Sequence, residues 1–411
     1  MPTTNTYSPT SPVILAILSI LIHVPQLRGH HSYPEVRDED SLERSTSVSQ
    51  HALHAITSWE VITASETHAF SASRFHPNVP GELERPLACC VLSLYHYLCR
   101  GDIEEMTSYV RKAFGLLREL SSNTTASRLE VRFEESLRRA WWMTYMCICN
   151  ASIVSCKSPD DTIDISKVTI PYPTVAGSSK TIRAEETLVA ATLLLVALVK
   201  GFNSETVAQS LHHNIRIMDD VIVHLLHDSR QDGHHRTPRV EGSESRLADC
   251  FRTTARIRLN SARIKLQRYR AMMDNLRILS RFDTNHRSRL STSDGALECA
   301  TSLDAEKAAR IFPFSAAQSK AICQQSASNI VNGLNQLLNS GSARYTLMMI
   351  SHFGSSAHAE GTHDGVSQET QKRLADGVET AIRVLAHFSR GFGAVAALKG
   401  NVPRTSKTTE N

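Results

Sequence analysis

The stretch RRAWWMTYMCICNASIVSCKSPDDTIDISKVTIPYP, residues 138–173, joins a long apolar pattern to a proline-rich exit and holds two of the chain's three tryptophans. At helical spacing its apolar residues fall on two adjacent faces: Leu137, Trp141, Tyr145 and Ile148, then Trp142, Met146, Cys149 and Ile153. So wide an apolar arc predicts one long helix, or two stacked end to end, over 128–156, surrounded by other helices. We interpret the paired tryptophans as core residues. The alternative is a ligand site in which tryptophan stacks and arginine binds an acid.

Two acidic residues precede the arginine pair by one helical turn. Glu134 lies four residues before Arg138, and Glu135 lies four residues before Arg139. An acid placed N-terminal to a base at this spacing favours an ion pair on a helix. We expect both pairs to stabilise the first turns of the tryptophan helix.

Prolines end this helical pattern. Pro159, Pro171 and Pro173, with β-branched residues between them, exclude a helix from 157 to 174. The sequence therefore predicts an extended segment after the tryptophan helix.

Helical patterns dominate the rest of the chain. They cover 13–24, 84–100, 102–120, 184–227, about 245–280, 304–338 and 368–398. Polar segments at 28–49 and 228–244 are expected to be loops, the second of them mobile, and the ends 1–10 and 401–411 are expected to be disordered. With no strand-rich region, the sequence predicts an all-α fold: a large array of packed antiparallel helices over 11–400, as one domain or two halves.

Composition narrows the class of protein. The 411 residues are 41% apolar and 21% charged, and the net charge of +4 gives no overall field that demands nucleic acid or an acidic membrane. The apolar runs 13–24 and 188–199 are shorter than the roughly 20 residues of a membrane-spanning helix. Nine cysteines without a C-x2-C pair favour a reducing compartment, the cytosol or the nucleus.

A basic helix is expected near residue 260. Four cations, Arg263, Lys265, Arg268 and Arg270, lie beside a short apolar seam. We interpret them as a solvated basic face on a packed helix, and as a candidate nuclear-import signal. The seam is too short for a basic-zipper arrangement, and no DNA-binding residue is identified.

Chemistry-bearing motifs are scarce. The histidine doublets at 30–31, 212–213 and 234–235 lie far apart and have no acid or cysteine at ligand spacing. The aspartate pairs 160–161 and 219–220 lack a supporting pattern, and no nucleophile, phosphate-loop or zinc-protease motif occurs. The sequence therefore predicts no catalytic residue, no metal site and no enzyme.

The stretch 138–173 resembles the middle homology region of fungal zinc-binuclear-cluster transcription factors, in which an arginine-rich helix with a double tryptophan leads to an "IPYP" exit. The matching residues are Arg138, Arg139, Trp141, Trp142, Ser152, Ser155, Pro159, Ile163, Asp164, Ile170, Pro171 and Pro173. The stretch 262–272, ARIKLQRYRAM, is similar to the family's "I-x-L-H-R" helix, with Gln267 in place of histidine. The stretches 11–21 and 85–120 resemble the family's earlier helices.

The resemblance implies a nuclear regulator of RNA polymerase II transcription that binds protein partners of the transcription machinery, a small effector, or a homo- or heterodimeric relative. Arg138, Arg139, Trp141, Trp142, Pro171 and Pro173 are then the structural core or line an effector pocket. The family's zinc cluster is absent from this sequence, so zinc is expected only in a missing N-terminal module, and contact with DNA is expected to be indirect. Two alternatives stay open: an all-α enzyme or lipid- or small-molecule-binding protein, and a decoy that pairs with a full-length factor.

Overall fold

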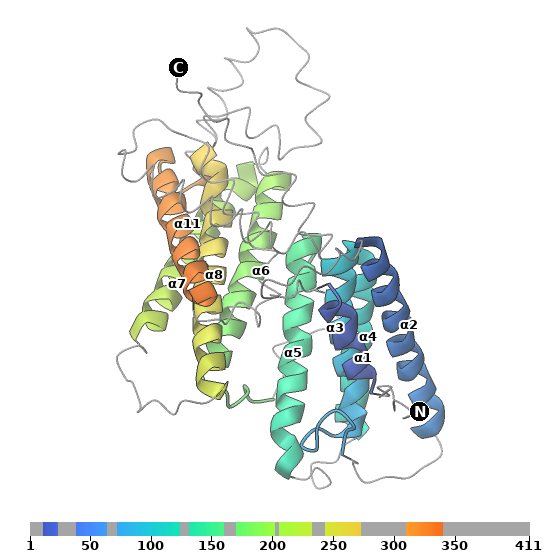
Figure 1. The fold of residues 1–411 in the computed structure, drawn as a ribbon. Coiled ribbons are helices and arrows are strands. Elements are labelled where there is room, and N and C mark those ends of the chain that lie inside the picture. Colours follow the sequence, from blue (N-terminus) through green and yellow to red (C-terminus); the bar gives the residue numbers. More distant parts are fainter. Residues whose placement is uncertain are drawn as a thin grey trace, which may run out of the picture. The chain divides into compact units, whose positions relative to one another are not determined.

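The computed structural model describes residues 11–23, 38–63, 72–123, 131–159, 170–201, 205–231, 243–272 and 310–339. Within these ranges the chain is 86% helical, with nine α-helices and no strands, which confirms the all-α fold class (Figure 1). The expected disordered ends and the expected helix at 368–398 lie outside the described residues. So does most of the expected loop at 228–244, except that its first residues continue a helix to Gln231.

The chain divides into two compact units. Among the described residues, the first unit contains 11–155, 159 and 170–174, and the second contains 156–158 and everything from 175 onward. The sequence was compatible with either one domain or two halves and did not decide between them.

The first unit is built around α3. Its elements are α1 (Pro12–Leu21), α2 (Asp38–Thr63), the short 3-10 helix η1 (Gly81–Leu83), α3 (Glu84–Arg100), α4 (Ile103–Asn123) and α5 (Val131–Ser155). Helix α3 packs against α1, α2, α4 and α5. It ends at Gly101, whose positive φ of 67° lets the amides of Gly101 and Asp102 bond back to the carbonyls of Tyr97 and His96. This glycine turns the chain from α3 into α4.

A buried carboxylate ties three segments of this unit together. Glu84, at the start of α3, is fully buried and accepts hydrogen bonds from the Ser11 and Ser73 hydroxyls, both at 2.5 Å. The backbone amides of Arg74 and Phe75 also donate to it, at 2.8 and 3.3 Å. Because Ser11 caps α1, this one side chain joins α1, the 72–80 segment and α3.

The expected loop at 28–49 is wrong over its second half, where α2 begins at Asp38. The buried side of α2 steps by four, three and four through Ser45, Ser49, Ala52 and Ile56. Half of that stripe is serine, so the apolar pattern is weak. The serines satisfy their hydroxyls locally, Ser45 on the Leu42 carbonyl and Ser49 on the Thr46 carbonyl.

The second unit is built around α8. Its helices are α6 (Ser178–Gly201), α7 (Glu205–Gln231), α8 (Ser243–Met272) and α11 (Ala316–Asn339), and α8 packs against the other three. The helical patterns expected over 184–227 form two helices, the first ending at Gly201. Helices α8 and α11 are antiparallel, because Asn260 pairs with Asn329 and Gln267 with Ser319.

Helices α8 and α11 approach each other closely at Gly333. A Cβ at this position lies 2.8 Å from the Ile257 Cγ1, whereas a Cβ at Gly115 in α4 meets nothing within 4 Å. Gly115→Ala should therefore stabilise the first unit by about 0.5–1 kcal/mol through helix propensity alone. At Gly333 the same gain is opposed by overpacking of about 1–3 kcal/mol, so Gly333→Ala should destabilise the second unit.

Urea unfolding followed by far-UV circular dichroism measures both glycine variants. Equal stabilisation by the two substitutions would show that α8 and α11 do not approach as closely as described.

Two sequence expectations concern membranes and cysteines. None of the described helices has the length and apolarity needed to span a membrane. None of the eight described cysteines forms a disulfide with another described residue, and each is buried except Cys156. Buried thiols pack as small apolar groups.

Candidate functional site

The paired tryptophans lie inside the first unit, on α5. Trp141 and Trp142 are 9% and 6% exposed. The Trp141 ring meets Phe114 of α4 edge-on, with ring centres 5.7 Å apart, and Trp142 meets Tyr145 in the same way at 5.5 Å. Such edge-to-face contacts add to the stabilisation that comes from area burial. The Trp141 ring therefore joins α5 to α4, whereas the contact between Trp142 and Tyr145 lies within α5.

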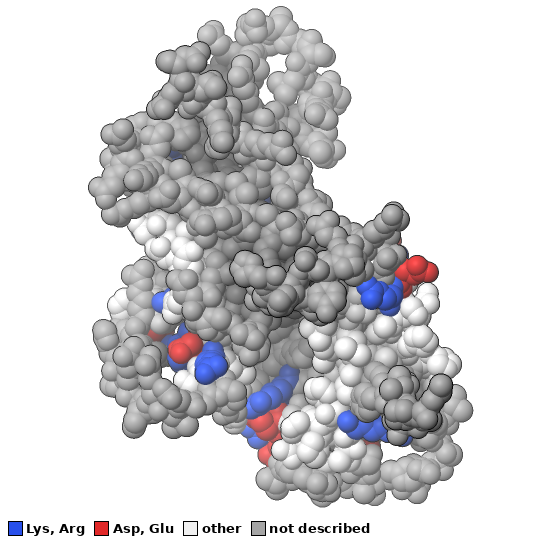
Figure 2. Space-filling view, viewed as in Figure 1, with Lys and Arg blue, Asp and Glu red and all other residues white. Residues whose placement is uncertain are grey.

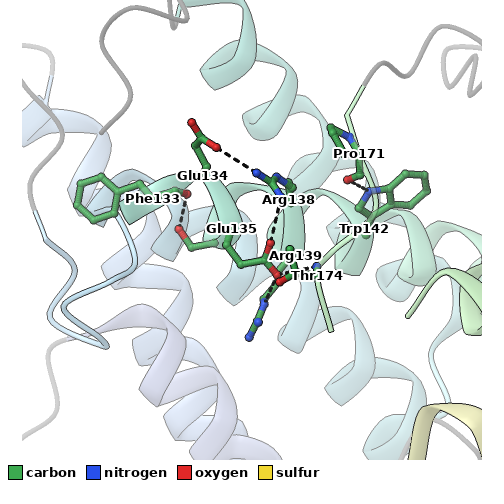
Figure 3. A network of polar contacts seen from close by, with 9 residues as sticks. Phe133, Glu134, Glu135, Arg138, Arg139, Trp142, Pro171 and Thr174 are labelled. Carbon is green, nitrogen blue, oxygen red and sulfur yellow. Dashed lines mark hydrogen bonds and ion pairs between the residues drawn. The ribbon is translucent and has the colours of Figure 1, made fainter. Parts of the chain in front are cut away.

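The proline-rich exit packs against this aromatic cluster. The Trp142 indole N–H donates a 2.8 Å hydrogen bond to the Pro171 carbonyl (Figure 3). The Tyr172 ring stacks on Trp142 with a centre-to-centre distance of 4.6 Å and an angle of 27°. Pro171 is itself exposed and Pro173 half-buried. Trp142 and Pro171, which are 29 residues apart, thus join the two ends of the quoted stretch into one structural element.

The arginine pair forms the expected ion pairs. Arg138 contacts Glu134 at 3.0 Å and Glu135 at 3.5 Å, and Arg139 contacts Glu135 at 2.8 Å. Glu135 also accepts the Thr174 amide at 3.0 Å, so it fastens the end of the exit segment to α5 (Figure 3). Burial raises the pKa of Glu135, but the hydrogen bonds from Arg139 and Thr174 outweigh it, and the net pKa is lowered.

The two indole N–H groups differ, which allows a matched test. The Trp142 N–H is bonded to Pro171, whereas the buried Trp141 N–H has no hydrogen-bond partner within the described ranges. Replacing either tryptophan by phenylalanine removes similar apolar area. Trp142→Phe also leaves the Pro171 carbonyl without its donor, so it should destabilise the first unit by about 1–2 kcal/mol more than Trp141→Phe.

The measurement for the tryptophan pair is urea unfolding followed by circular dichroism. Equal losses in the two variants would mean that the bond to Pro171 contributes nothing to stability.

The basic face of α8 is not solvated, and that expectation is wrong. Lys265 is 9% exposed, and Arg263, Arg268 and Arg270 are only partly exposed. Arg263 makes a two-pronged pair with Asp219 of α7, at 2.9 and 3.0 Å. A nuclear-import signal has to be accessible to its receptor, so the burial of Lys265 weighs against that use of the helix.

Buried charge continues along α8. Arg258 is 1% exposed and forms an ion pair with Glu185 of α6, which is fully buried. Gln267 is fully buried as well, and it donates to Asp219 at 3.3 Å and accepts the Ser319 hydroxyl of α11 at 2.8 Å. The sequence pattern missed these pairs because each partner comes from another helix, 44 to 73 residues away in the chain. A run of cations looks the same whether it faces water or buried acids.

The aspartate pair required by the enzyme alternative does not converge. Asp219 is 4% exposed and held by Arg263, whereas Asp220 is exposed. Of the histidine doublets, only 212–213 is described; His212 is half-buried and His213 exposed. Within the described ranges, no three His, Cys, Asp or Glu side chains come together as metal ligands do.

On the face shown in Figure 2, the coloured charged residues lie in small separated groups, several of them with both signs, and form no continuous basic patch.

Comparison of the chain with protein-family models, curated proteins and solved structures found no match.

Proposed function

We propose that this chain is the helical regulatory region of a fungal-type transcription factor, acting in the nucleus through protein partners or a bound effector. One observation carries the proposal: the two halves of the family-like stretch pack on each other. Trp142 binds the Pro171 carbonyl and stacks on Tyr172, and Glu135 binds the Thr174 amide. If the motif serves to hold the fold together, its helix and its proline-rich exit are expected to contact each other in this way.

The role assigned to the motif residues is structural. Arg138 and Arg139 pair with acids of the preceding turn. The two tryptophans are buried, Trp141 against α4 and Trp142 against the exit segment. None of them presents a free reactive group to solvent in this arrangement. The proposal is therefore that α5 and its exit segment hold the first unit in shape, and that contact surfaces elsewhere on the helices bind partners.

The direct test is to fuse the whole chain to a heterologous DNA-binding domain and to measure a reporter gene. We expect activation or repression relative to the DNA-binding domain alone, under at least one growth condition. A Glu119→Ala fusion serves as a control, because it changes an exposed α4 residue that makes none of these contacts. It should give the same reporter level as the fusion of the unchanged chain. A reporter that never departs from the level of the DNA-binding domain alone would contradict the proposal. If a zinc-cluster protein then co-purified with the chain, the decoy alternative would replace it.

A further inference from the structure

One stripe along α8 carries polar side chains where a helical bundle normally places apolar ones. Thr254, Arg258, Ser261, Lys265 and Arg268 follow each other at steps of four, three, four and three. That spacing defines a single buried seam of a packed helix. The first four side chains are at most 9% exposed, and Arg268 is partly buried. The seam therefore holds two buried cations, Arg258 and Lys265, and a partly buried third, Arg268.

Lys265 differs from Arg258 in the same stripe. Arg258 has the buried Glu185 as its partner. No carboxylate in the part of the chain that the structure describes bonds to the Lys265 ammonium, and the ionisable groups that act on it there are Arg268 and the Cys156 thiol. Burial, reinforced by Arg268, lowers the pKa of Lys265 to about 8, although Cys156 acts in the opposite direction. The ammonium therefore stays largely charged at neutral pH, which is costly in the interior.

A second buried polar group lies one helical turn from this lysine. The Ser261 hydroxyl is fully buried and has no hydrogen-bond partner among the residues that the structure describes. Cys156, which interacts electrostatically with both Lys265 and Arg268, is the exposed cysteine of the described residues. The cluster formed by Ser261, Lys265 and Arg268 is thus close to solvent at Cys156. Among the described residues, no acceptor pairs with the Ser261 hydroxyl and no carboxylate pairs with the Lys265 ammonium.

We propose that Lys265, Ser261 and Arg268 form a binding site for a small anion, a carboxylate or a phosphate, that enters beside Cys156. An anion supplies the charge that Lys265 lacks and an acceptor for the Ser261 hydroxyl. Arg268 adds a second donor suited to the planar or tetrahedral oxygens of such groups. This inference holds whether or not the chain regulates transcription, since it concerns binding alone.

The test uses Cys156 as a reporter in the full chain. Alkylation by neutral iodoacetamide is followed at this residue by peptide mass spectrometry, with inorganic phosphate, succinate or sodium chloride added at matched ionic strength. We expect saturable loss of Cys156 alkylation with phosphate or with succinate, and none with chloride. The anion that protects at the lower concentration identifies the class of ligand. Matched ionic strength removes general charge screening as a cause.

Two variants separate the site from ordinary surface charge. Lys265→Met should abolish the protection, and it should raise the melting temperature in anion-free buffer because a buried charge is removed. Lys157→Met removes an exposed charge next to Cys156 in sequence and should keep the protection. Ser261→Ala, which is close in size, should shift protection to higher anion concentrations.

Three results would overturn the proposal. They are absence of protection by both phosphate and succinate, equal protection by chloride, and unchanged protection in Lys265→Met and Ser261→Ala.

Discussion

Glu185→Ala is expected to destabilise the second unit by about 3–5 kcal/mol, because it leaves the Arg258 guanidinium buried without its counter-charge. Arg258 is 1% exposed and cannot reach water without opening the contact between α6 and α8. The matched control is Asp249→Ala, which removes a surface pair with Arg252 in which the Asp249 side chain is 64% exposed. That change should cost less than about 1 kcal/mol.

The double variant Glu185→Leu with Arg258→Met completes this test. Replacing both charges by apolar groups removes their desolvation cost together with their attraction, so its stability should lie close to that of the unchanged protein. Urea unfolding is followed by circular dichroism for the whole chain and by tryptophan fluorescence for the first unit, which contains all three tryptophans, Trp59, Trp141 and Trp142. A single variant as stable as the double variant would contradict a buried ion pair.

Glu84→Ala is expected to destabilise the first unit by about 2–4 kcal/mol. The substitution removes the common acceptor of the Ser11 and Ser73 hydroxyls and of two backbone amides. The two hydroxyls and the Arg74 amide lose this acceptor together, whereas the Phe75 amide keeps its 2.8 Å bond to the Ser73 hydroxyl. Because the carboxylate joins α1 and the 72–80 segment to α3, the loss should appear as a lower urea midpoint in tryptophan fluorescence.

Two controls accompany the Glu84 variant. Glu119→Ala changes an exposed acid of the same unit and should stay within about 0.5 kcal/mol of the unchanged protein. Ser11→Ala removes one of the four donors and should cost about 1 kcal/mol. If Glu84→Ala unfolded at the same urea concentration as Glu119→Ala, the buried carboxylate would not be a stabilising contact.

Local signals in the sequence predicted a large part of the fold. Helix α3 runs from Glu84 to Arg100, the range that its helical pattern predicts, and α5 lies within the range expected from its two apolar faces. The Glu134–Arg138 and Glu135–Arg139 pairs also follow from spacing within one helix. These features depend on residues close together in the chain, so the sequence carries their signal directly.

The features that the sequence did not predict depend on residues far apart. The interior position of the α8 cations is decided by Glu185 and Asp219, which belong to other helices. The role of Glu84 depends on two serines outside its helix. Ser11 lies 73 residues before Glu84 in the chain, and Ser73 lies 11 residues before it. The start of α2 was hidden because serines replace apolar residues on its buried side. In each case a polar residue is buried because a distant partner satisfies it, and no local pattern records the partner.

The most direct measurement of the proposed role is the chromatin occupancy of the full chain, epitope-tagged and expressed from its own locus in living cells. If the helices are the regulatory region of a transcription factor or of its complex, the tagged chain should be enriched at a limited set of promoters relative to gene bodies. Occupancy indistinguishable from that of an untagged strain across growth conditions would contradict the account.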